Sequence, residues 1–484
     1  MVSIGNISNT KNAADEDELE PAAVPSTNVM RRSRPVVMGL ASFRGEVGGG
    51  SRSRAKAGRP PAWHRIDSTV LVAVTTVPGR AFHWGMLHSS SARSRFAVES
   101  IALVTVNKNK MVKKGLLERL QEGPVVGDGS YIITLEKRGY VMAGPYTTEV
   151  IIEHPEAVKQ LHREFMRAGA DVLQALTFSA TDDRLSSPDA PGNETGKSIT
   201  CKELNSQACA IVKEVVCDGD VLVCGGLSNT PSYAQGKGKA AVQQEFSKQV
   251  DSFMEQDVDF LLAEFFGYVE EAEWAIEALK GKGKPVACTL RIGPTGDDSG
   301  VSPGECAVRM AKVGADVVGL NCRFDANTCL KTIRMMKDAL EKEGLSPYLM
   351  VQPNGYLSPE TEQTKDGWTS LPEFPFALET RQMTRFEVNH FVRAAFDLGV
   401  RYIGGCCGFE PHHIRAISEE LSPERGGKLG EASKKHRPWG GAMKSDQSER
   451  DFMNGKDTRE YWESVKPALG RPGFPDVQAK LFRQ

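Results

Sequence analysis

The chain has 484 residues, of which 40% are hydrophobic and 25% are charged, so it can bury a large core in one or more domains. Its formal net charge of −2 argues against a nucleic-acid-binding surface over the whole molecule. No stretch approaches the roughly 18 apolar residues that suggest a membrane span, and the longest candidate, Val70–Val77, is only as long as a strand. We therefore expect a soluble, cytoplasmic protein with no nucleic-acid or membrane partner.

Residues 1–110 differ from the rest of the chain in composition. An acidic run at Asp15–Glu20 is followed by Arg-, Ser- and Gly-rich sequence with few acidic residues and little periodicity. Such a leader is typical of a mitochondrial transit peptide, but its acidic start argues against one. We expect a disordered extension, or upstream sequence that does not belong to the native protein. A helical pattern begins at Met111, which makes Met111 a candidate initiator.

From residue 111 to about residue 425, short runs of Val, Ile and Leu alternate with amphipathic segments that end at glycine. The amphipathic segments predict helices at His154–Gly169, Leu330–Gly344 and Phe386–Gly399, the first with Pro155 in its first turn. The short apolar runs predict strands. The eight predicted strands are Val125–Gly127, Asp171–Phe178, Val221–Gly226, Asp259–Phe265, Pro285–Ile292, Asp316–Asn321, Tyr348–Gln352 and Tyr402–Gly405.

Eight apolar strands, each followed by a helix, imply an α/β fold with a parallel sheet that is covered on both faces. Eight such units close most simply into a (β/α)8 TIM barrel, and a doubly wound open sheet is the alternative. We assign residues 111–425 to the barrel and residues 426–484 to a C-terminal arm. The arm is polar and carries Tyr461 and Trp462, so we expect it to pack on another subunit of a homo-oligomer.

Ten cysteines are spread irregularly along the chain, and most lie in apolar segments, as reduced core cysteines do. We do not expect a disulfide framework in a chain of this length without a secretory signal. Cys322 follows the sixth predicted strand, and Cys406 and Cys407 follow the eighth. Because the active sites of barrels lie at the carboxyl ends of the strands, these three thiols should face one mouth.

The adjacent pair Cys406 and Cys407 needs its own explanation. Adjacent cysteines do not easily form a disulfide, because the ring that contains it is strained, but both can bind one metal ion. Three sulfur ligands suit Zn²⁺, and three protein ligands leave the fourth tetrahedral position open, as in catalytic zinc sites. From the residues alone, a zinc site and three buried core cysteines are equally plausible.

Several motifs resemble the betaine–homocysteine S-methyltransferase family over about residues 111–425, and none of them lies in residues 1–110. The motifs are Gly127-Asp-Gly129, Leu135-Glu-Lys-Arg-Gly-Tyr140, His154-Pro-Glu-Ala157, Gly304-Glu-Cys-Ala307, Leu371-Pro-Glu-Phe-Pro-Phe376 and Arg401-Tyr-Ile-Gly-Gly-Cys-Cys-Gly-Phe-Glu-Pro411. The Gly-Gly-Cys-Cys-Gly element also occurs in the wider homocysteine methyltransferase family, which includes enzymes that use S-methylmethionine. The resemblance is therefore stronger for the methyl acceptor than for the donor.

The resemblance implies a zinc barrel that methylates the thiol of homocysteine to form methionine. Its catalytic zinc ligands would be Cys322, Cys406 and Cys407. A free thiol with a pKa near 8.5 is mostly protonated at neutral pH, and binding to zinc deprotonates it. Homocysteine would then attack a methyl group of a positively charged donor as a thiolate. The leaving group departs neutral, so the reaction needs no general acid.

Asp128 and Glu264 match positions near homocysteine in the family. Glu264 would accept hydrogen bonds from the ammonium group of the substrate, and backbone amides around Gly129 would bind its carboxylate. Each residue also has a structural alternative. Asp128 could cap a helix or a turn, and Glu264 could pair with a lysine or arginine.

The expected donor site departs from the betaine enzyme. Betaine carries a quaternary ammonium, which an aromatic cage binds by cation–π attraction. Where the betaine enzyme has tryptophan and tyrosine, this chain has Tyr146 and Ser179, and the lost aromatic ring would weaken a cation site by about 0.5–2 kcal/mol. Ser130 and Ser179 instead resemble the paralogue that prefers S-methylmethionine, so both donors stay open. Phe265 replaces a family tyrosine that can approach the zinc, and it has no hydroxyl with which to bind a metal.

Two other functions fit parts of the pattern. A folate- or cobalamin-linked methionine synthase uses a similar acceptor barrel, but we see no room for a cobalamin module after residue 425. A non-catalytic protein that binds zinc or homocysteine would not need all five of Cys322, Cys406, Cys407, Asp128 and Glu264. We therefore expect a zinc-dependent methyltransferase with an onium donor.

Overall fold

The computed structural model describes residues 113–142, 144, 147–187, 190, 199–217, 219–435 and 458–464. Eight parallel strands form one sheet in the order β1-β8-β7-β6-β5-β4-β3-β2. The strands are β1 (Val125–Val126), β2 (Val172–Gln174), β3 (Leu222–Ser228), β4 (Phe260–Phe266), β5 (Val286–Leu290), β6 (Val317–Cys322), β7 (Tyr348–Pro353) and β8 (Val400–Ile403). All eight predicted strands are confirmed, with ends that differ by a few residues.

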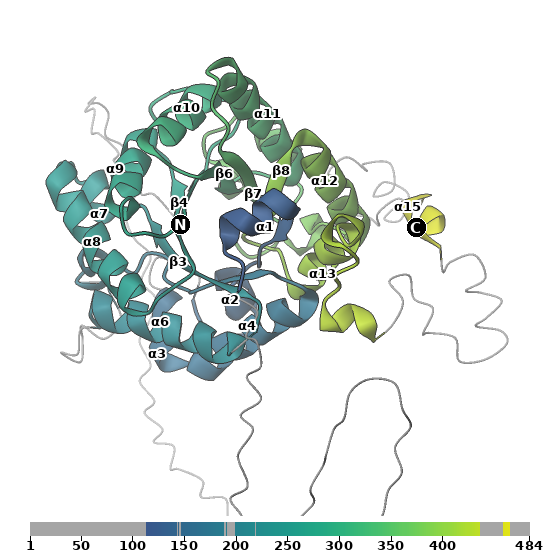
Figure 1. The fold of residues 1–484 in the computed structure, drawn as a ribbon, viewed down its shortest axis with the longest axis horizontal. Coiled ribbons are helices and arrows are strands. Elements are labelled where there is room, and N and C mark those ends of the chain that lie inside the picture. The colour runs from purple at the N-terminus through teal and green to yellow at the C-terminus, as the bar shows by residue number, and fades with distance from the viewer. Residues whose placement is uncertain are drawn as a thin grey trace, which may run out of the picture. The chain divides into compact units, whose positions relative to one another are not determined.

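Helices surround the ring of strands (Figure 1). The principal helix after each strand, from β1 to β8, is α4 (Pro155–Ala168), α6 (Cys201–Val216), α8 (Lys239–Glu255), α9 (Val269–Leu279), α10 (Pro303–Val313), α11 (Ala326–Lys342), α12 (Arg385–Leu398) and α13 (Pro411–Glu420). Shorter helices are α1 (Leu116–Glu122), α2 (Ile132–Lys137), α3 (Val150–Glu153), α5 (Asp182–Leu185), α7 (Pro231–Ala234) and α15 (Arg459–Ser464). None of these described helices is both long and apolar enough to cross a bilayer.

The strand order confirms the barrel. From β2 to β8 each strand pairs with the next one in chain order, and β8 pairs with β1 in parallel, with Val125 opposite Tyr402. The doubly wound open sheet is therefore the wrong alternative, because its strand order would reverse at a switch point. The interpretations of residues 1–110 and of Met111 lie outside the described residues, and the role of the C-terminal arm stays a prediction.

The three helices predicted from periodicity are present as α4, α11 and α12. Gly169 and Gly399 end α4 and α12 in the left-handed conformation, with φ of 113° and 102°. The α11 helix begins earlier than predicted because the Asp325 side chain accepts the Thr328 amide at 2.9 Å and caps it. The helical pattern after Met111 forms a described helix only from Leu116.

The hydrophobic core has two layers. Between the sheet and the helices lies the larger cluster, and inside the barrel lies a smaller one built from side chains such as Phe260, Met350 and Tyr402. The α1 helix adds Leu116 and Leu120 to the inner cluster, and it lies across the centre of the ring of strands (Figure 1). This helix closes the amino-terminal end of the barrel, so the opposite end is left for a site.

An aspartate directly precedes each of the strands β2, β4 and β6, and all three have the same hydrogen bonds. Each backbone amide donates at 2.8 Å to a carbonyl of the preceding odd-numbered strand, and each side chain accepts the amide of that same residue. The pairs are Asp171 with Val126, Asp259 with Val223, and Asp316 with Val286. Asp171 in this way joins β1 to β2 and closes the barrel.

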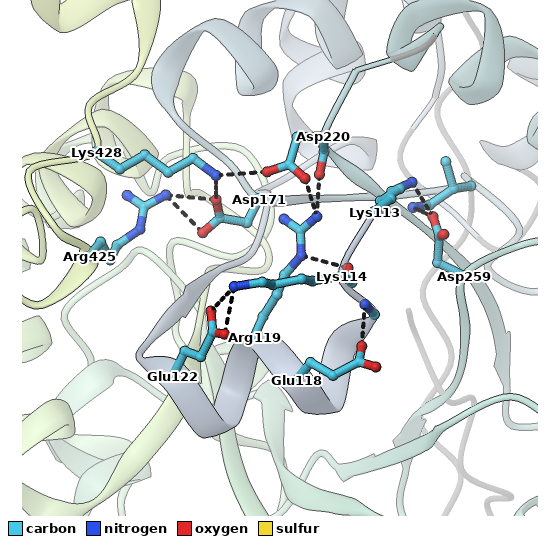
Figure 2. Close-up of polar contacts among 12 residues, drawn as sticks. Lys113, Lys114, Glu118, Arg119, Glu122, Asp171, Asp220, Asp259, Arg425 and Lys428 are labelled. Carbon is cyan, nitrogen blue, oxygen red and sulfur yellow. Dashed lines mark hydrogen bonds and ion pairs between the residues drawn. The ribbon is translucent and has the colours of Figure 1, made fainter. Parts of the chain in front are cut away.

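Asp171 is also the buried centre of a charge network (Figure 2). Arg425 contacts both carboxylate oxygens at 2.7 and 2.8 Å, and Lys428 contacts one at 2.7 Å. Burial by itself would raise the pKa of Asp171, but the two cations outweigh it and hold that pKa below its ordinary value. Lys428 lies 3.5 Å from Asp220, which Arg119 of α1 contacts at 2.7 Å. The network thus connects α1, β2 and the segment after α13.

Replacing Arg425 with glutamine should destabilise the barrel. The side chains of Asp171 and Arg425 are only 5% and 4% exposed, and removal of one partner from a buried pair costs about 3–5 kcal/mol. We expect a fall in melting temperature of about 5–10 °C at pH 7, measured by differential scanning calorimetry. Because the depressed pKa of Asp171 stabilises the fold only above the pKa of the unfolded chain, the difference should shrink as the pH falls through the folded-state pKa.

The matched control is Lys428→Gln, because Lys428 pairs with the same carboxylate but is 49% exposed. An exposed pair contributes about 0–1 kcal/mol, so the melting temperature should fall by no more than about 2 °C. Equal losses from the two variants would contradict the assignment of Arg425 as the principal partner of Asp171.

Candidate active site and metal centre

A cavity of about 310 Å³ lies at the carboxyl ends of the strands. Side chains from the ends of β1, β2, β4, β6, β7 and β8 line it together with part of the loop between β7 and α12. Among the predicted site residues, the cavity is lined by Asp128, Gly129, Glu264, Cys322, Cys406 and Cys407. Six of the eight predicted site residues therefore lie at one cavity.

The three predicted thiols converge at this cavity. The Sγ atoms of Cys322 and Cys407 lie 3.5 Å apart, those of Cys406 and Cys407 lie 4.0 Å apart, and all three lie within 4.8 Å of one another. Four sulfurs bound tetrahedrally at about 2.3 Å from one Zn²⁺ would be separated by roughly 3.8 Å. The spacing fits such a metal site, and it argues against three unrelated core cysteines. All ten cysteines are free thiols.

The end of β7 brings the thiols of β6 and β8 together. Cys322 pairs with Pro353 in the parallel register of β6 and β7. The Cys406 amide donates to the Pro353 carbonyl at 2.8 Å, and the Gly355 amide donates to the Cys407 carbonyl at 2.7 Å. The segment after β8 is therefore held across the end of β7, within reach of Cys322.

Glycines make this turn possible. A Cβ atom on Gly405 would lie only 2.0 Å from the ring of Phe409, so no larger residue fits there. Gly408 has a φ of 83°, a left-handed conformation that glycine adopts without strain. Both glycines flank the thiol pair, so the local sequence accounts for the close approach of the two sulfurs to Cys322.

The thiols perturb one another electrostatically. Hydrogen bonds from Cys406 and Cys407 hold the pKa of Cys322 well below its ordinary value, and the same contacts raise the pKa of Cys406. By themselves the three groups therefore favour one thiolate beside two thiols. A bound divalent cation would favour the thiolate form of all three, and a set of three sulfurs is suited to borderline-soft ions such as Zn²⁺.

Glu264 lies at the end of β4, and amide groups hold both of its oxygens. Its Oε1 accepts from Gln174 Nε2, and its Oε2 accepts from Asn321 Nδ2 at 2.9 Å. The Asn321 amide cannot turn, because its Oδ1 accepts from the Phe265 amide and the Thr289 hydroxyl, both at 3.0 Å. Burial raises the pKa of Glu264 to about 7. Within the described ranges no lysine or arginine pairs with this carboxylate, so the alternative of an ion pair is not supported.

Asp128 follows β1 and is 2% exposed. Its Oδ2 accepts from the Tyr131 hydroxyl and from the Gln174 backbone amide, both at 2.7 Å. Burial raises the pKa of Asp128 to about 7, although these two hydrogen bonds lower it. Because the amide bound to Asp128 belongs to the end of β2, the carboxylate does not serve as the N-cap of α2.

Gly129 lies where the chain passes close to the segment after β8. A Cβ atom there would come within 2.3 Å of the Phe409 carbonyl oxygen, and the neighbouring Ser130 amide donates to that same oxygen at 2.8 Å. The Ser130 amide therefore already has a hydrogen-bond acceptor within the protein, although Ser130 itself lines the cavity. The binding of a substrate carboxylate by amides around Gly129 stays a prediction.

Aromatic side chains form part of the cavity wall, and among the rings of two edge-to-face pairs only Phe265 was singled out from the sequence. Phe178 and Phe265 meet edge to face with ring centroids 5.3 Å apart, and Trp368 and Phe374 do so at 5.2 Å. The last two come from the loop between β7 and α12, where Phe374 lies within the motif at 371–376 and Trp368 shortly before it. The guanidinium of Arg323 lies 5.7 Å from the centre of the Phe265 ring.

Of the two residues expected in the donor cage, only Ser179 is described, and it is not among the described residues that line the cavity. Ser179 is buried and donates its amide to the Ser228 hydroxyl at 3.0 Å. Tyr146 lies outside the described residues. The contribution of both residues to donor binding stays a prediction.

Ser179, Phe265 and Cys322 share an unusual backbone conformation. Their φ values are 56°, 66° and 60°, and they lie at or beyond the carboxyl ends of β2, β4 and β6. A residue with a side chain in this region costs about 1–3 kcal/mol, and such residues cluster at functional sites. Three of the five described non-glycine residues with positive φ thus lie at this end of the barrel, which supports the assignment of a site there.

Comparison with known proteins agrees with this geometry. The family model for homocysteine S-methyltransferase matches residues 125–421. Betaine–homocysteine S-methyltransferase 1 of Xenopus laevis is 54% identical over 366 residues, which are 75% of this chain and 89% of that protein. The S-methylmethionine–homocysteine S-methyltransferase of Pongo abelii is 50% identical over 366 residues, 75% of this chain and 96% of its own. The identities to these two relatives, 54% and 50%, are too similar to discriminate between betaine and S-methylmethionine as the methyl donor.

A solved structure of the metallated homocysteine methyltransferase MmuM from Escherichia coli is similar over 61% of this chain and 95% of its own, with 18% identity and a TM-score of 0.46. The assignment of the family rests instead on the sequence matches, which extend over most of the chain and nearly the whole of each relative. This chain belongs to the homocysteine S-methyltransferase family, a family of methyltransferases.

Proposed function

We propose that this chain is a zinc-dependent enzyme that transfers a methyl group from betaine or S-methylmethionine to the sulfur of homocysteine and so forms methionine. The observation that carries the proposal is the convergence of three sulfurs and two buried carboxylates on one cavity. Cys322, Cys406 and Cys407 would hold Zn²⁺, as their sulfur spacing supports. When bound, the ion supplies positive charge that favours the thiolate form of a fourth sulfur ligand.

Asp128 and Glu264 would bind the ammonium group of homocysteine. Gln174 joins the two carboxylates, because its backbone amide donates to Asp128 and its side chain donates to Glu264. Burial favours their neutral forms, and an approaching ammonium group favours the charged forms. An amino acid whose ammonium and thiol groups are a few bonds apart matches carboxylates that share one cavity with the three sulfurs.

The transfer is a single displacement at the methyl carbon. A bond forms between the homocysteine sulfur and the methyl carbon, while the bond from that carbon to the nitrogen of betaine, or to the sulfonium of S-methylmethionine, breaks. The electron pair leaves with the nitrogen or sulfur, so the leaving group is neutral and the step needs no general acid. The aromatic wall would attract the cationic donor and exclude water.

The direct test measures methionine formation from homocysteine with each donor, together with zinc stoichiometry on the same preparation of the full chain. We expect methionine with at least one of the two donors and about one zinc ion per chain. A fully metallated protein that forms no methionine with either donor would favour the alternative of a non-catalytic zinc- or homocysteine-binding protein.

Replacing Cys406 with alanine should abolish methionine formation and release most of the zinc, because two thiolates hold the ion much less tightly than three. Zinc content is measured by inductively coupled plasma mass spectrometry after gel filtration. The matched control is Cys306→Ala, which removes a buried thiol of α10 away from the cavity. Turnover at the wild-type rate by the Cys406 variant would contradict the metal assignment.

Replacing Glu264 with glutamine should raise the KM for homocysteine about ten- to hundredfold, because the charged acceptor of the ammonium group becomes a neutral amide. Zinc content and the KM for the donor should change less than about twofold. Glu270→Gln is a suitable control, because Glu270 contacts the Tyr233 hydroxyl on an exposed part of the barrel. An unchanged KM for homocysteine would remove Glu264 from the acceptor site.

Replacing Ser179 with tyrosine should improve the use of betaine relative to S-methylmethionine. An added aromatic partner strengthens a cation site by about 0.5–2 kcal/mol, or about two- to thirtyfold in relative kcat/KM. The φ of 56° at Ser179 disfavours a large side chain, so the melting temperature is measured in parallel. A folded variant with an unchanged donor ratio would mean that other residues form the cage.

A further inference from the structure

A chain of hydrogen bonds leads away from Asp128 into the layer of helices. The Tyr131 hydroxyl donates to Asp128 at 2.7 Å and lies 2.8 Å from Nδ1 of His162. Tyr131 directly precedes α2, and His162 is a fully buried residue of α4. The Tyr131 ring also packs against His162 and Phe165, with centroids 4.8 and 5.2 Å away. Two segments of chain, residues 128–131 and α4, therefore meet behind one carboxylate.

The protonation of this chain can be assigned from the environment of the imidazole. Burial lowers the pKa of His162 to about 3, so the ring is neutral and carries one N–H. When Asp128 is ionised, Tyr131 donates to it and His162 donates from Nδ1 to the tyrosine oxygen. Among the residues that the structure describes, Nε2 of His162 has no hydrogen-bond partner, so the Tyr131 contact is the one that fixes the imidazole.

The chain restricts the motion of the Asp128 carboxylate. Tyr131 and the Gln174 amide both bind Oδ2, and two donors from different segments oppose rotation of the group. The Asp128 carbonyl in turn accepts the Gly405 amide at 3.0 Å, next to Cys406. Hydrogen bonds to both the side chain and the backbone of Asp128 thus set the position of its carboxylate relative to the thiols.

We propose that Tyr131 and His162 are positioning residues for acceptor binding, which hold the Asp128 carboxylate in the orientation that receives the ammonium group of homocysteine. This inference rests on the proposed function. Tyr131 acts through its hydroxyl on Asp128, and His162 acts on Asp128 only through Tyr131. A merely structural role would instead lower stability and affect zinc content and both substrates together.

The first test compares Tyr131→Phe with the wild-type protein, because this change removes only the hydroxyl and keeps the ring packing. The dissociation constant of homocysteine, measured by calorimetry on the zinc-loaded full chain, should rise about tenfold, as should its KM. Zinc content, kcat and the KM for the donor should stay within about twofold. The matched control is Tyr233→Phe. It removes a hydroxyl that lies away from the cavity and donates to Glu270 at 3.0 Å.

The second test uses His162. His162→Leu removes the contact to Tyr131 and should weaken homocysteine binding, whereas His162→Asn offers an amide donor near the position of Nδ1 and should restore part of it. The double variant Tyr131→Phe/His162→Leu should bind homocysteine no more weakly than Tyr131→Phe alone, because both changes break one chain. Losses of homocysteine affinity that add up in the double variant would overturn the proposal, whatever the stability of either single variant.

The outcomes separate this inference from the proposed function. If the wild-type protein binds homocysteine and Tyr131→Phe binds it equally well, the positioning role is wrong and the proposed function stands. If the zinc-loaded wild-type protein does not bind homocysteine, the proposed function fails and the positioning role fails with it.

Discussion

The site depends on the way in which the chain after β8 crosses the end of β7. Neighbouring strands lie about 4.8 Å apart, so β6 and β8 are separated by roughly twice that distance, yet their sulfurs lie within 4.8 Å of one another. The hydrogen bond from the Cys406 amide to the Pro353 carbonyl holds the segment inward, where the Sγ of Cys407 lies 3.5 Å from that of Cys322. Without this crossing the three thiols would remain separate core cysteines.

The two ends of the even-numbered strands β2, β4 and β6 have different roles, since one end stabilises the strand pairing and the other faces the candidate site. At their amino ends, aspartates such as Asp171 fix the pairing with the preceding strand. At or beyond their carboxyl ends, Ser179, Phe265 and Cys322 have strained, left-handed conformations. A barrel can hold such strain at one end because its opposite end and the core over-determine the positions of the strands.

The proposed reaction brings two cations into one cavity, and they require different receptors. The ammonium group of homocysteine carries N–H donors, so it suits the carboxylates of Asp128 and Glu264. A quaternary ammonium or sulfonium has no such donor, so aromatic faces suit it better, and Trp368 and Phe374 supply rings on the loop side of the cavity. In the proposed reaction, the carboxylates and the aromatic rings of the cavity would therefore each receive one of the two cations.

The sequence by itself determined the eight strands, the barrel and the residues at the strand ends. These features could be predicted because apolar periodicity and the position after a strand are local properties, and a parallel barrel always collects its strand ends at one mouth. The placement of Cys322, Cys406 and Cys407 at that mouth followed from this rule, whereas Asp128 and Glu264 were selected by the family resemblance.

Only the tertiary structure decided the contacts between residues that are distant in sequence. Arg425 lies 254 residues from Asp171, and His162 lies 31 residues from Tyr131, so no local pattern could indicate either pair. The rings of Trp368 and Phe374 belong to a loop whose path is fixed by such contacts, including a hydrogen bond from Arg323 to the Thr369 hydroxyl at 2.9 Å. The position of a loop side chain depends on partners elsewhere in the fold, and for this reason it could not be predicted from the sequence.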